Sequence, residues 1–288
     1  MTNATPVLYA CGAVLLAAFL PNFAKIGGKR SAPSLSATLY ATVVFIVYLV
    51  TAILGKSVQS MLSMDNLTFL KLLGAGVIRA GIWLCLFAAL STGQVNRVLP
   101  LYLMTDVIQI ILSLILGKSH AGIWRLCCIV LVLLGAVMTE SRSRRGKNTR
   151  WLWFSLLALA ANIGLVFYYD RLLPSVSQDA IRLGETGLAA LMLWVLSAAG
   201  KAMNSFKKME TDNWLFLILA GLAYSFAVFC ETQAHAIGDV TVLEPIRCAL
   251  LPLMVLFARL IGKEKMPGSA VLGVALFSIG TFGLMLNF

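Results

Sequence analysis

The sequence predicts an all-α integral membrane protein with ten transmembrane helices, arranged as two inverted five-helix repeats. Three observations predict this fold: the composition, ten long apolar segments and an internal repeat. Of the 288 residues, 60% are hydrophobic and only 12% are charged, whereas a soluble domain has about 25% charged residues. So few polar side chains cannot cover a water-exposed surface, which excludes a soluble globular or a disordered chain.

The apolar segments are each long enough to cross a bilayer, which takes about 20 mostly apolar residues in a helix. In chain order they span roughly 6–25, 34–54, 68–90, 95–116, 122–139, 151–171, 178–199, 213–236, 240–261 and 267–287. They lack the polar–apolar alternation of outer-membrane strands. The first segment has no basic stretch before it and leads into Pro21, Asn22 and Lys25, so we expect a retained helix and not a cleaved signal.

An internal repeat is visible at a constant shift of 145 residues, without gaps. The ten matching positions include Gly76 with Gly221, Pro100 with Pro245, and Gly135 with Gly280. The repeat predicts a first five-helix half at 1–139, a basic linker at 140–150 and a second half at 151–288. Because five is odd, the second half must enter the membrane from the opposite side, as in many secondary transporters.

The basic residues predict the orientation of the chain. The net charge is +11, but the basic residues lie between apolar runs and not on one soluble face, so we do not expect nucleic-acid binding. The loops after the first, fifth, seventh and ninth helices carry thirteen Lys and Arg, and the opposite loops carry five. The positive-inside rule therefore predicts that both termini are non-cytoplasmic.

The stretch from Gly238 to Lys265, GDVTVLEPIRCALLPLMVLFARLIGKEK, combines a small-residue turn, a Glu-Pro helix start and a Gly-Lys-Glu exit. A weaker copy runs from Gly93 to Lys118, with Leu99 in place of the Glu. With ten helices and the repeat, the whole chain resembles the EamA-type transporters of the drug/metabolite transporter superfamily. The resemblance implies transport of a small metabolite along a path lined by helices 1–4 and 6–9. It also implies a bacterial inner (plasma) membrane.

Several ionisable residues lie inside the expected helices, where each costs about 2.5–3.5 kcal/mol on insertion scales and usually faces a cavity or a partner. They are Arg79, Asp106, Arg182, Glu185, Glu231 and His235, with Glu244 and Arg247 near the start of the ninth helix. Helical spacing places three groups on shared faces: Tyr224, Glu231 and His235; Arg79 and Trp83; and Tyr102, Asp106 and Gln109. These faces predict that the third, fourth, eighth and ninth helices line one central space.

Two of these pairs have i, i+3 spacing near a helix start. Glu244 and Arg247 are either a structural ion pair, with Pro245 in the first turn, or a gate. Arg182 and Glu185 have the same two interpretations.

The other charged positions also have structural alternatives. His235 could cap the end of its helix, where the dipole favours a cation. Asp106 and Arg79 could pair across two helices. Glu231 has only His235 as a charged neighbour on its own helix, and desolvation would favour its protonated form. Glu231 is therefore our leading candidate for a substrate or proton site.

The mixture of acidic, basic and aromatic residues predicts a secondary active transporter of a small amphipathic metabolite, of the amino-acid or organic-amine class. Proton coupling and alternating access around a midplane cavity are part of this hypothesis. We expect no cofactor and no metal, and the partners are the substrate, the bilayer and a second copy packed through helices 5 and 10. The alternatives are an intramembrane enzyme acting on a lipid-like substrate, a channel and a scaffold. An enzyme would need a nucleophile–base set or a metal cluster, and neither H-E-x-x-H nor G-x-S-x-G occurs.

Overall fold

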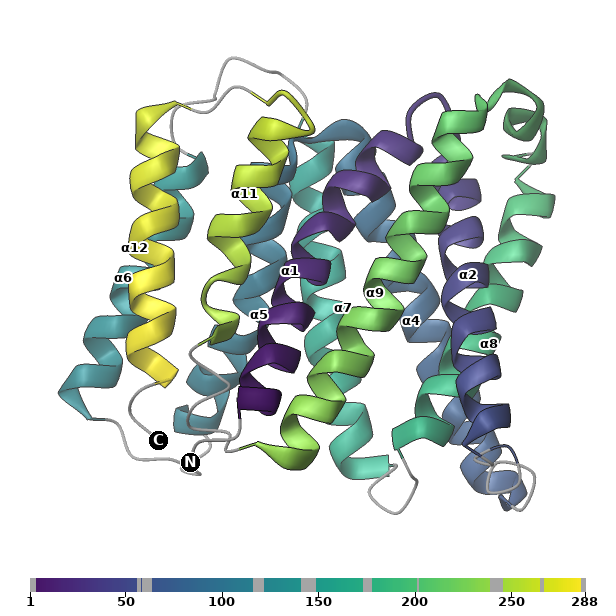
Figure 1. Cartoon of the computed structure of the whole chain (residues 1–288), viewed down its shortest axis with the longest axis horizontal. Coiled ribbons are helices and arrows are strands. Elements are labelled where there is room, and N and C mark those ends of the chain that lie inside the picture. Colours follow the sequence, from purple (N-terminus) through teal and green to yellow (C-terminus); the bar gives the residue numbers. More distant parts are fainter. Residues whose placement is uncertain are drawn as a thin grey trace. The chain divides into compact units, whose positions relative to one another are not determined.

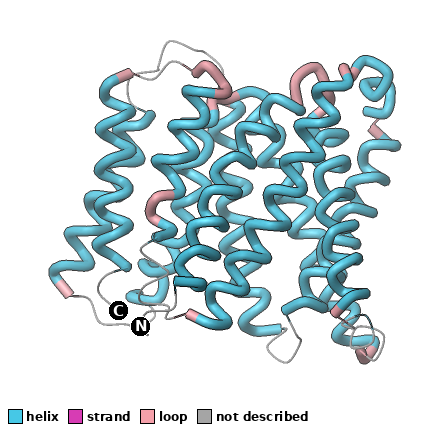
Figure 2. The backbone as a smooth tube through the Cα atoms, viewed as in Figure 1, coloured by secondary structure: helices cyan, strands magenta, loops and turns pink. Residues whose placement is uncertain are grey.

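The computed structural model describes residues 4–55, 58, 64–115, 122–140, 149–172, 178–200, 202–238, 246–264 and 267–285. Within these ranges every regular element is helical, and no strand occurs (Figure 2). The prediction of an all-helical chain is therefore confirmed for the described residues. The basic linker predicted at 140–150 lies mostly outside them.

The helices begin and end close to the predicted positions (Figure 1). They are α1 (Ala4–Gly27), α2 (Pro33–Leu54), α4 (Asn66–Thr92), α5 (Val95–Ile115), α6 (Ile123–Glu140), α7 (Arg150–Leu172), α8 (Gln178–Ala199), the 3-10 helix η1 (Ala202–Lys208), α9 (Thr211–Ile237), α11 (Leu250–Leu260) and α12 (Gly268–Met285). The agreement follows from the long apolar runs, because a chain in lipid has to satisfy its backbone groups internally.

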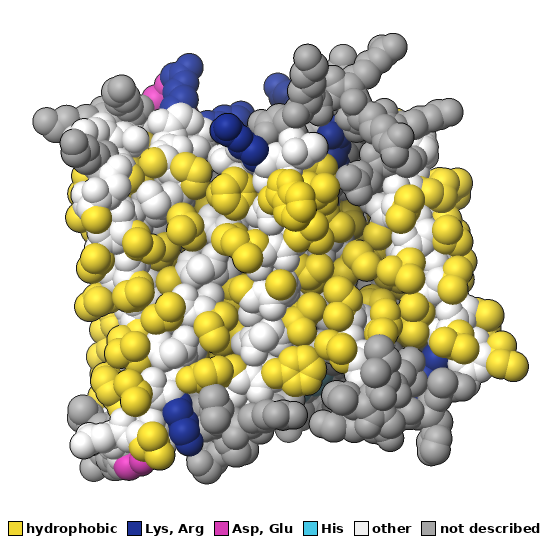
Figure 3. All heavy atoms as spheres, turned by 180° about the vertical axis from the view of Figure 1, so that it is seen from behind, with side chains coloured by type: hydrophobic (Ala, Val, Ile, Leu, Met, Phe, Trp, Pro, Cys, Tyr) yellow, Lys and Arg dark blue, Asp and Glu magenta, His cyan; other side chains and the backbone are white. Residues whose placement is uncertain are grey.

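Six of the described helices are long and apolar enough to cross a membrane: α1, α2, α4, α7, α8 and α9. α6, α11 and α12 are shorter apolar helices. Large hydrophobic side chains are exposed along most of these helices. The visible face in Figure 3 shows the same pattern, with Lys and Arg near the helix ends. This exposure suits lipid as the solvent; the full set of ten spans stays a prediction.

The helix bounds themselves repeat at the shift found in the sequence. Adding 145 to the bounds of α2 (33–54) gives 178–199, which are the bounds of α8. The same shift converts 66–92 of α4 into 211–237 of α9, and 123–140 of α6 into 268–285 of α12. The repeat in a few glycines and prolines thus extends to the start and end of three pairs of helices.

The predicted helix at 240–261 differs from the structure at its beginning. Residues 246–247 are helical, 248–249 form a turn, and α11 begins at Leu250. Pro252 explains the interruption, because it lacks the N–H that would bond to the carbonyl of Cys248 and its ring clashes with that carbonyl. Pro252 therefore lies in the first turn of α11 and does not kink the middle of a helix.

The chain divides into two compact units that do not coincide with the two predicted halves. Unit 1 contains residues 1–22, 93–150 and 226–288, and unit 2 contains residues 23–92 and 151–225. Each unit takes segments from both halves of the sequence, because helices pack against partners from the other half. The halves at 1–139 and 151–288 therefore describe the repeat and not the packing.

In unit 1, α6 and α12 pack side by side through glycines (Figure 1). A Cβ built on Gly135 would lie 2.5 Å from the backbone nitrogen of Phe277, and one built on Gly280 would lie 2.9 Å from the backbone nitrogen of Val132. Position 135 thus faces 277, while the higher number 280 faces the lower number 132, so the helices run antiparallel. Only glycine permits such close backbone contact.

In unit 2, α2 and α8 also run antiparallel. Their contact contains buried hydroxyl groups, because Thr38 and Ser197 share a hydrogen bond of 2.8 Å between their oxygens. Thr38 also donates to the carbonyl of Leu193 (3.0 Å), and Trp194 donates its indole N–H to Thr42 (3.0 Å). These bonds hold the two helices together.

A carboxylate from a loop caps α5 in unit 1. Glu264 follows α11 and accepts hydrogen bonds from the backbone N–H groups of Val95 (3.0 Å) and Asn96 (3.5 Å). Lys263 before it has φ of 53°, a left-handed conformation that turns the chain toward this helix start. A negative group is favourable there because the first N–H groups of a helix lack partners and carry the positive end of its dipole. The Gly-Lys-Glu motif therefore has a structural role in this half.

Candidate functional site

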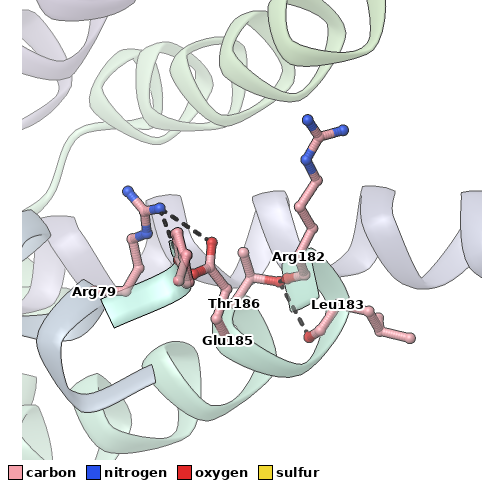
Figure 4. Close-up of polar contacts among 6 residues, drawn as sticks. Arg79, Arg182, Leu183, Glu185 and Thr186 are labelled. Atoms are coloured by element: carbon pink, nitrogen blue, oxygen red, sulfur yellow. Dashed lines mark hydrogen bonds and ion pairs between the residues drawn. The ribbon is translucent and has the colours of Figure 1, made fainter. Parts of the chain in front are cut away.

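A buried ion pair lies in unit 2 between α4 and α8. The Nη2 atom of Arg79 is 3.2 Å from Oε1 of Glu185, and the side chains are 14% and 4% exposed, respectively. Figure 4 shows the two groups pointing toward each other. Two opposite charges in such a place are stabilised mainly by each other, because neither is solvated by bulk water.

Glycines determine how closely the two helices approach at this pair. A Cβ built on Gly76 would lie 2.6 Å from the Cβ of Leu188, and one built on Gly184 would overlap a methyl group of Leu72. Gly76 is three residues before Arg79, and Gly184 directly precedes Glu185. The missing side chains let α4 and α8 come close enough for the short Glu185 side chain to reach the guanidinium.

α7 contributes two tyrosines to the same region. Arg79 donates from Nη2 to the hydroxyl oxygen of Tyr169 at 3.2 Å. Tyr168 donates its hydroxyl to the carbonyl of Lys71 on α4 at 2.8 Å. Its ring occupies the space beside Gly74, where an added Cβ would be 2.5 Å from the Tyr168 oxygen. α7 is thereby fixed to the part of α4 that precedes Arg79, at Lys71 and Gly74.

An aromatic cluster begins one helical turn along α4 from Arg79. Trp83 meets Tyr40 of α2 edge-on, with ring centroids 5.3 Å apart, and meets Tyr224 of α9 edge-on at 6.4 Å. Tyr40 also contacts Tyr224 (5.9 Å) and Phe87 (5.4 Å). Trp83 and Tyr40 are each 3% exposed. One face of α4 thus carries a cation and then a set of rings, which suits a ligand with one charged and one apolar end.

The ion pair and the aromatic cluster occupy equivalent positions under the 145-residue shift. Arg79 maps onto Tyr224, and Glu185 maps onto Tyr40. The backbone contacts follow the same rule: the Cβ of Gly76 would lie 3.2 Å from the Glu185 carbonyl, and the Cβ of Gly221 would lie 3.2 Å from the Tyr40 carbonyl. The contact of α4 with α8 therefore holds two charged side chains, and the equivalent contact of α9 with α2 holds two aromatic rings.

A second ion pair lies in unit 1. Arg247 Nη1 is 3.2 Å from Oε1 of Glu231, and the side chains are 40% and 37% exposed. The structure therefore gives Arg247 a partner on α9, and the predicted partner Glu244 lies outside the described residues. The position of Glu231 among apolar residues predicts an enclosed carboxylate, whereas more than a third of this side chain is exposed.

Arg182 does not pair with Glu185, contrary to the prediction from their i, i+3 spacing. Figure 4 shows the Arg182 guanidinium pointing away from the Arg79–Glu185 pair. Between them Thr186 donates to the carbonyl of Arg182 (2.7 Å), as a helical threonine often does. Glu185 turns instead toward the close contact of α8 with α4, and that contact is not visible in the local spacing.

The other predicted site residues lie in the segments of unit 1. Tyr102 and Gln109 lie on α5 and are half-buried, and His235 lies half-buried in the last turn of α9, where the dipole favours a cation. The side chain of Asp106 lies outside the described ones. Its predicted pairing with Arg79 therefore stays a prediction.

Sequence reasoning missed Tyr40 and Tyr169. The repeat contained a signal for Tyr40, because it is the equivalent of Glu185. No pattern indicated Tyr169, which reaches Arg79 only because α7 packs on α4.

Residues 4–141 match the model of the EamA-like transporter family. Among the solved structures, 19 chains match. One of them, titled "Crystal structure of protein", is 17% identical, with a TM-score of 0.66 over 98% of this chain and 96% of that one; at this identity the likeness shows the fold alone. No curated protein matches the sequence significantly. The match over residues 4–141 supports membership in the EamA-type branch of the drug/metabolite transporter superfamily, and the long apolar helices support an integral membrane protein.

Proposed function

We propose that the chain is a secondary active transporter of a small amphipathic metabolite, of the amino-acid or organic-amine class. It works by alternating access between two inverted repeats of five transmembrane helices each. The observation that carries the proposal is the equivalence of helix contacts in the two repeats, including the packing around the buried Arg79–Glu185 pair.

The antiparallel packing of equivalent helices supports the inverted repeat. α2 with α8, and α6 with α12, are pairs related by the 145-residue shift, and the members of each pair run in opposite directions. Two copies of one helix can be antiparallel only if the repeats have opposite orientation in the membrane. Such repeats can exchange conformations, which opens a site first to one side and then to the other.

The residues of unit 2 support an amphipathic substrate. Arg79 offers a guanidinium to an anionic group, and Trp83, Tyr40 and Tyr224 offer ring surfaces to an apolar body. A substrate that used both would need a charged and an apolar end within a short distance. The additional substrate contacts that we propose are Tyr102, Asp106, Gln109 and His235, with Glu231 as a proton site.

The orientation and location complete the proposal. We infer from the basic loops that both termini are non-cytoplasmic and that the chain lies in a bacterial inner (plasma) membrane. A homodimer would pack through the outer surfaces of α6 and α12. These points are tested by labelling single cysteines at each terminus in intact cells and by measuring the mass of the purified protein in detergent.

The transport proposal is tested by counterflow in proteoliposomes. Vesicles preloaded with an unlabelled amino acid or amine should take up the labelled compound transiently, which a channel cannot produce. Glu231→Gln should abolish substrate-driven proton flux and leave counterflow intact. Wild-type proton flux in this variant would remove Glu231 from the mechanism, and absence of counterflow across a broad panel would refute the function itself.

A further inference from the structure

The two oxygens of the Glu185 carboxylate differ in their surroundings. Oε1 faces Arg79, whereas Oε2 is buried and has no hydrogen-bond partner among the residues that the structure describes. Burying an acceptor without a donor costs about 1–3 kcal/mol, so such an atom in the middle of a transporter calls for a function. A proton bound to this carboxylate would remove its negative charge.

Several described groups lie around Glu185. Arg79 faces it from α4, and Tyr169 of α7 lies behind Arg79. On α2, Tyr48 lies within electrostatic range of Glu185 and Arg79, and also of Arg182 on α8 and Tyr224 on α9. Arg182 is directed away from the pair (Figure 4), so among the described side chains Arg79 is the cation that contacts the Glu185 carboxylate.

This balance restricts what Arg79 can bind. A ligand carboxylate that approaches the guanidinium adds a second negative charge beside Glu185. An uncompensated charge in a low-dielectric place is strongly unfavourable, and the usual response is a change of protonation. Arg79 is the more exposed partner, at 14% against 4% for Glu185, so an anion reaches the guanidinium before it reaches the carboxylate.

We propose that Glu185 is the internal substitute for a substrate carboxylate at Arg79, and that it takes up one proton when a monoanionic carboxylate replaces it. The inference rests on the proposed function and specifies the coupling at its unit 2 site. The Arg79–Glu185 ion pair breaks, an Arg79–ligand ion pair forms, and a proton from water neutralises Glu185. The net charge of the group stays zero, so the anion and the proton bind together, as symport requires.

Two ligands of nearly equal shape should differ in the number of protons that bind with them. 3-Phenylpropanoate carries one negative charge, and phenylalanine adds an ammonium group to the same skeleton and has no net charge. The first should bind with one proton and the second with none, because the ammonium supplies both the missing charge and a donor for Oε2. In this proposal the phenyl group of either ligand packs against the rings of Trp83 and Tyr40, which are each 3% exposed here and have to separate to admit it.

Calorimetry of the purified wild-type protein in two buffers of different ionisation enthalpy counts the protons. We expect an uptake of about one proton with 3-phenylpropanoate, and a Kd that weakens about tenfold per pH unit between about pH 6 and about pH 8. Phenylalanine should show neither effect. Binding of 3-phenylpropanoate without proton uptake would overturn the proposal, and so would failure of both ligands to bind.

Variants then identify the residue that takes up the proton. Glu185→Gln should bind 3-phenylpropanoate with a Kd that changes less than about twofold over the same pH range, and Arg79→Gln should lose binding. Glu210→Gln is the matched control, because Glu210 is an exposed glutamate paired with Arg30 at the surface of the same unit. Proton uptake that persists in Glu185→Gln would refute the role of Glu185. If Glu185→Gln does not fold, the proton count of the wild type still decides between the outcomes.

Flux measurements separate this inference from the proposed function. Binding with proton uptake but no counterflow of either ligand would refute transport and leave the carboxylate exchange intact. Counterflow of 3-phenylpropanoate without proton movement would support transport and refute the exchange.

Discussion

The contact between α6 and α12 predicts a large difference between two glycine-to-alanine substitutions. A Cβ at Gly135 would lie 2.5 Å from the backbone nitrogen of Phe277, whereas ordinary contacts begin at 3.4 Å. The helices would have to move apart by about 3.4 minus 2.5, or 0.9 Å, because the obstructing atom belongs to the backbone and cannot rotate away. At Gly164 on α7 an added Cβ meets nothing within 4 Å.

Gly164→Ala should be neutral or stabilising by up to about 1 kcal/mol, since alanine is the better helix former. Gly135→Ala should be less stable than this control by about 1–3 kcal/mol, the usual cost of overpacking. The variants are compared in one detergent by thermal unfolding and by titration with a denaturing detergent. Gly280→Ala, the repeat equivalent, should behave like Gly135→Ala. Equal stability of Gly135→Ala and Gly164→Ala would show that the close contact does not exist.

Three further predictions follow from hydrogen bonds at single residues. Glu264→Ala removes the carboxylate cap of α5 and should cost about 0.5–2 kcal/mol in unfolding measurements. The hydrogen bonds from the side chain and the backbone of Thr68 hold the pKa of Asp65 below its ordinary value. Because the pKa of Asp65 is lower in the folded state, its carboxylate stabilises the first turn of α4 above about pH 4, and this stabilisation disappears as the pH falls through the folded pKa. Hydrogen exchange of the backbone amides in this first turn should speed up as the pH is lowered. In Asp65→Ala these amides should lack the protection at every pH. Tyr169→Phe removes one partner of Arg79 and should weaken 3-phenylpropanoate binding by about 2- to 12-fold in calorimetry, and an unchanged Kd would exclude Tyr169 from the ligand-bound site.

The buried ion pair shows where reasoning from local spacing ends. The residue types predicted that Arg79 and Glu185 need partners, because a charge in an apolar helix is costly. Spacing along the chain suggested Arg182 as the partner of Glu185, and Asp106 on the fourth helix was the candidate partner of Arg79. The actual pairing follows from the close contact of α4 with α8 at Gly76 and Gly184. Such a contact joins residues more than a hundred positions apart, and no pattern within one helix contains it.

Glu231 illustrates the same limit for a candidate proton site. Its position among apolar residues predicted an isolated carboxylate, but Arg247 lies 3.2 Å away in the folded chain. The interruption before α11 shows a related limit: it fits the missing N–H of Pro252, but Pro21 and Pro100 lie inside α1 and α5 without ending them, so a proline alone does not predict where a helix stops.

The sequence by itself determined that lipid surrounds the chain, where the helices lie and that the chain contains a repeat. These properties depend on composition and on apolar runs, and lipid admits few other structures for such a chain. The bounds of α2, α4 and α6 and of their equivalents then agree to the residue with the 145-residue shift. Only the tertiary structure decided which charges meet, that Tyr40 and Tyr169 join the site, and that each compact unit draws on both repeats. The physical reason is that a pairing depends on how closely two helix backbones approach, and this distance is determined by glycines and side chains on both helices together.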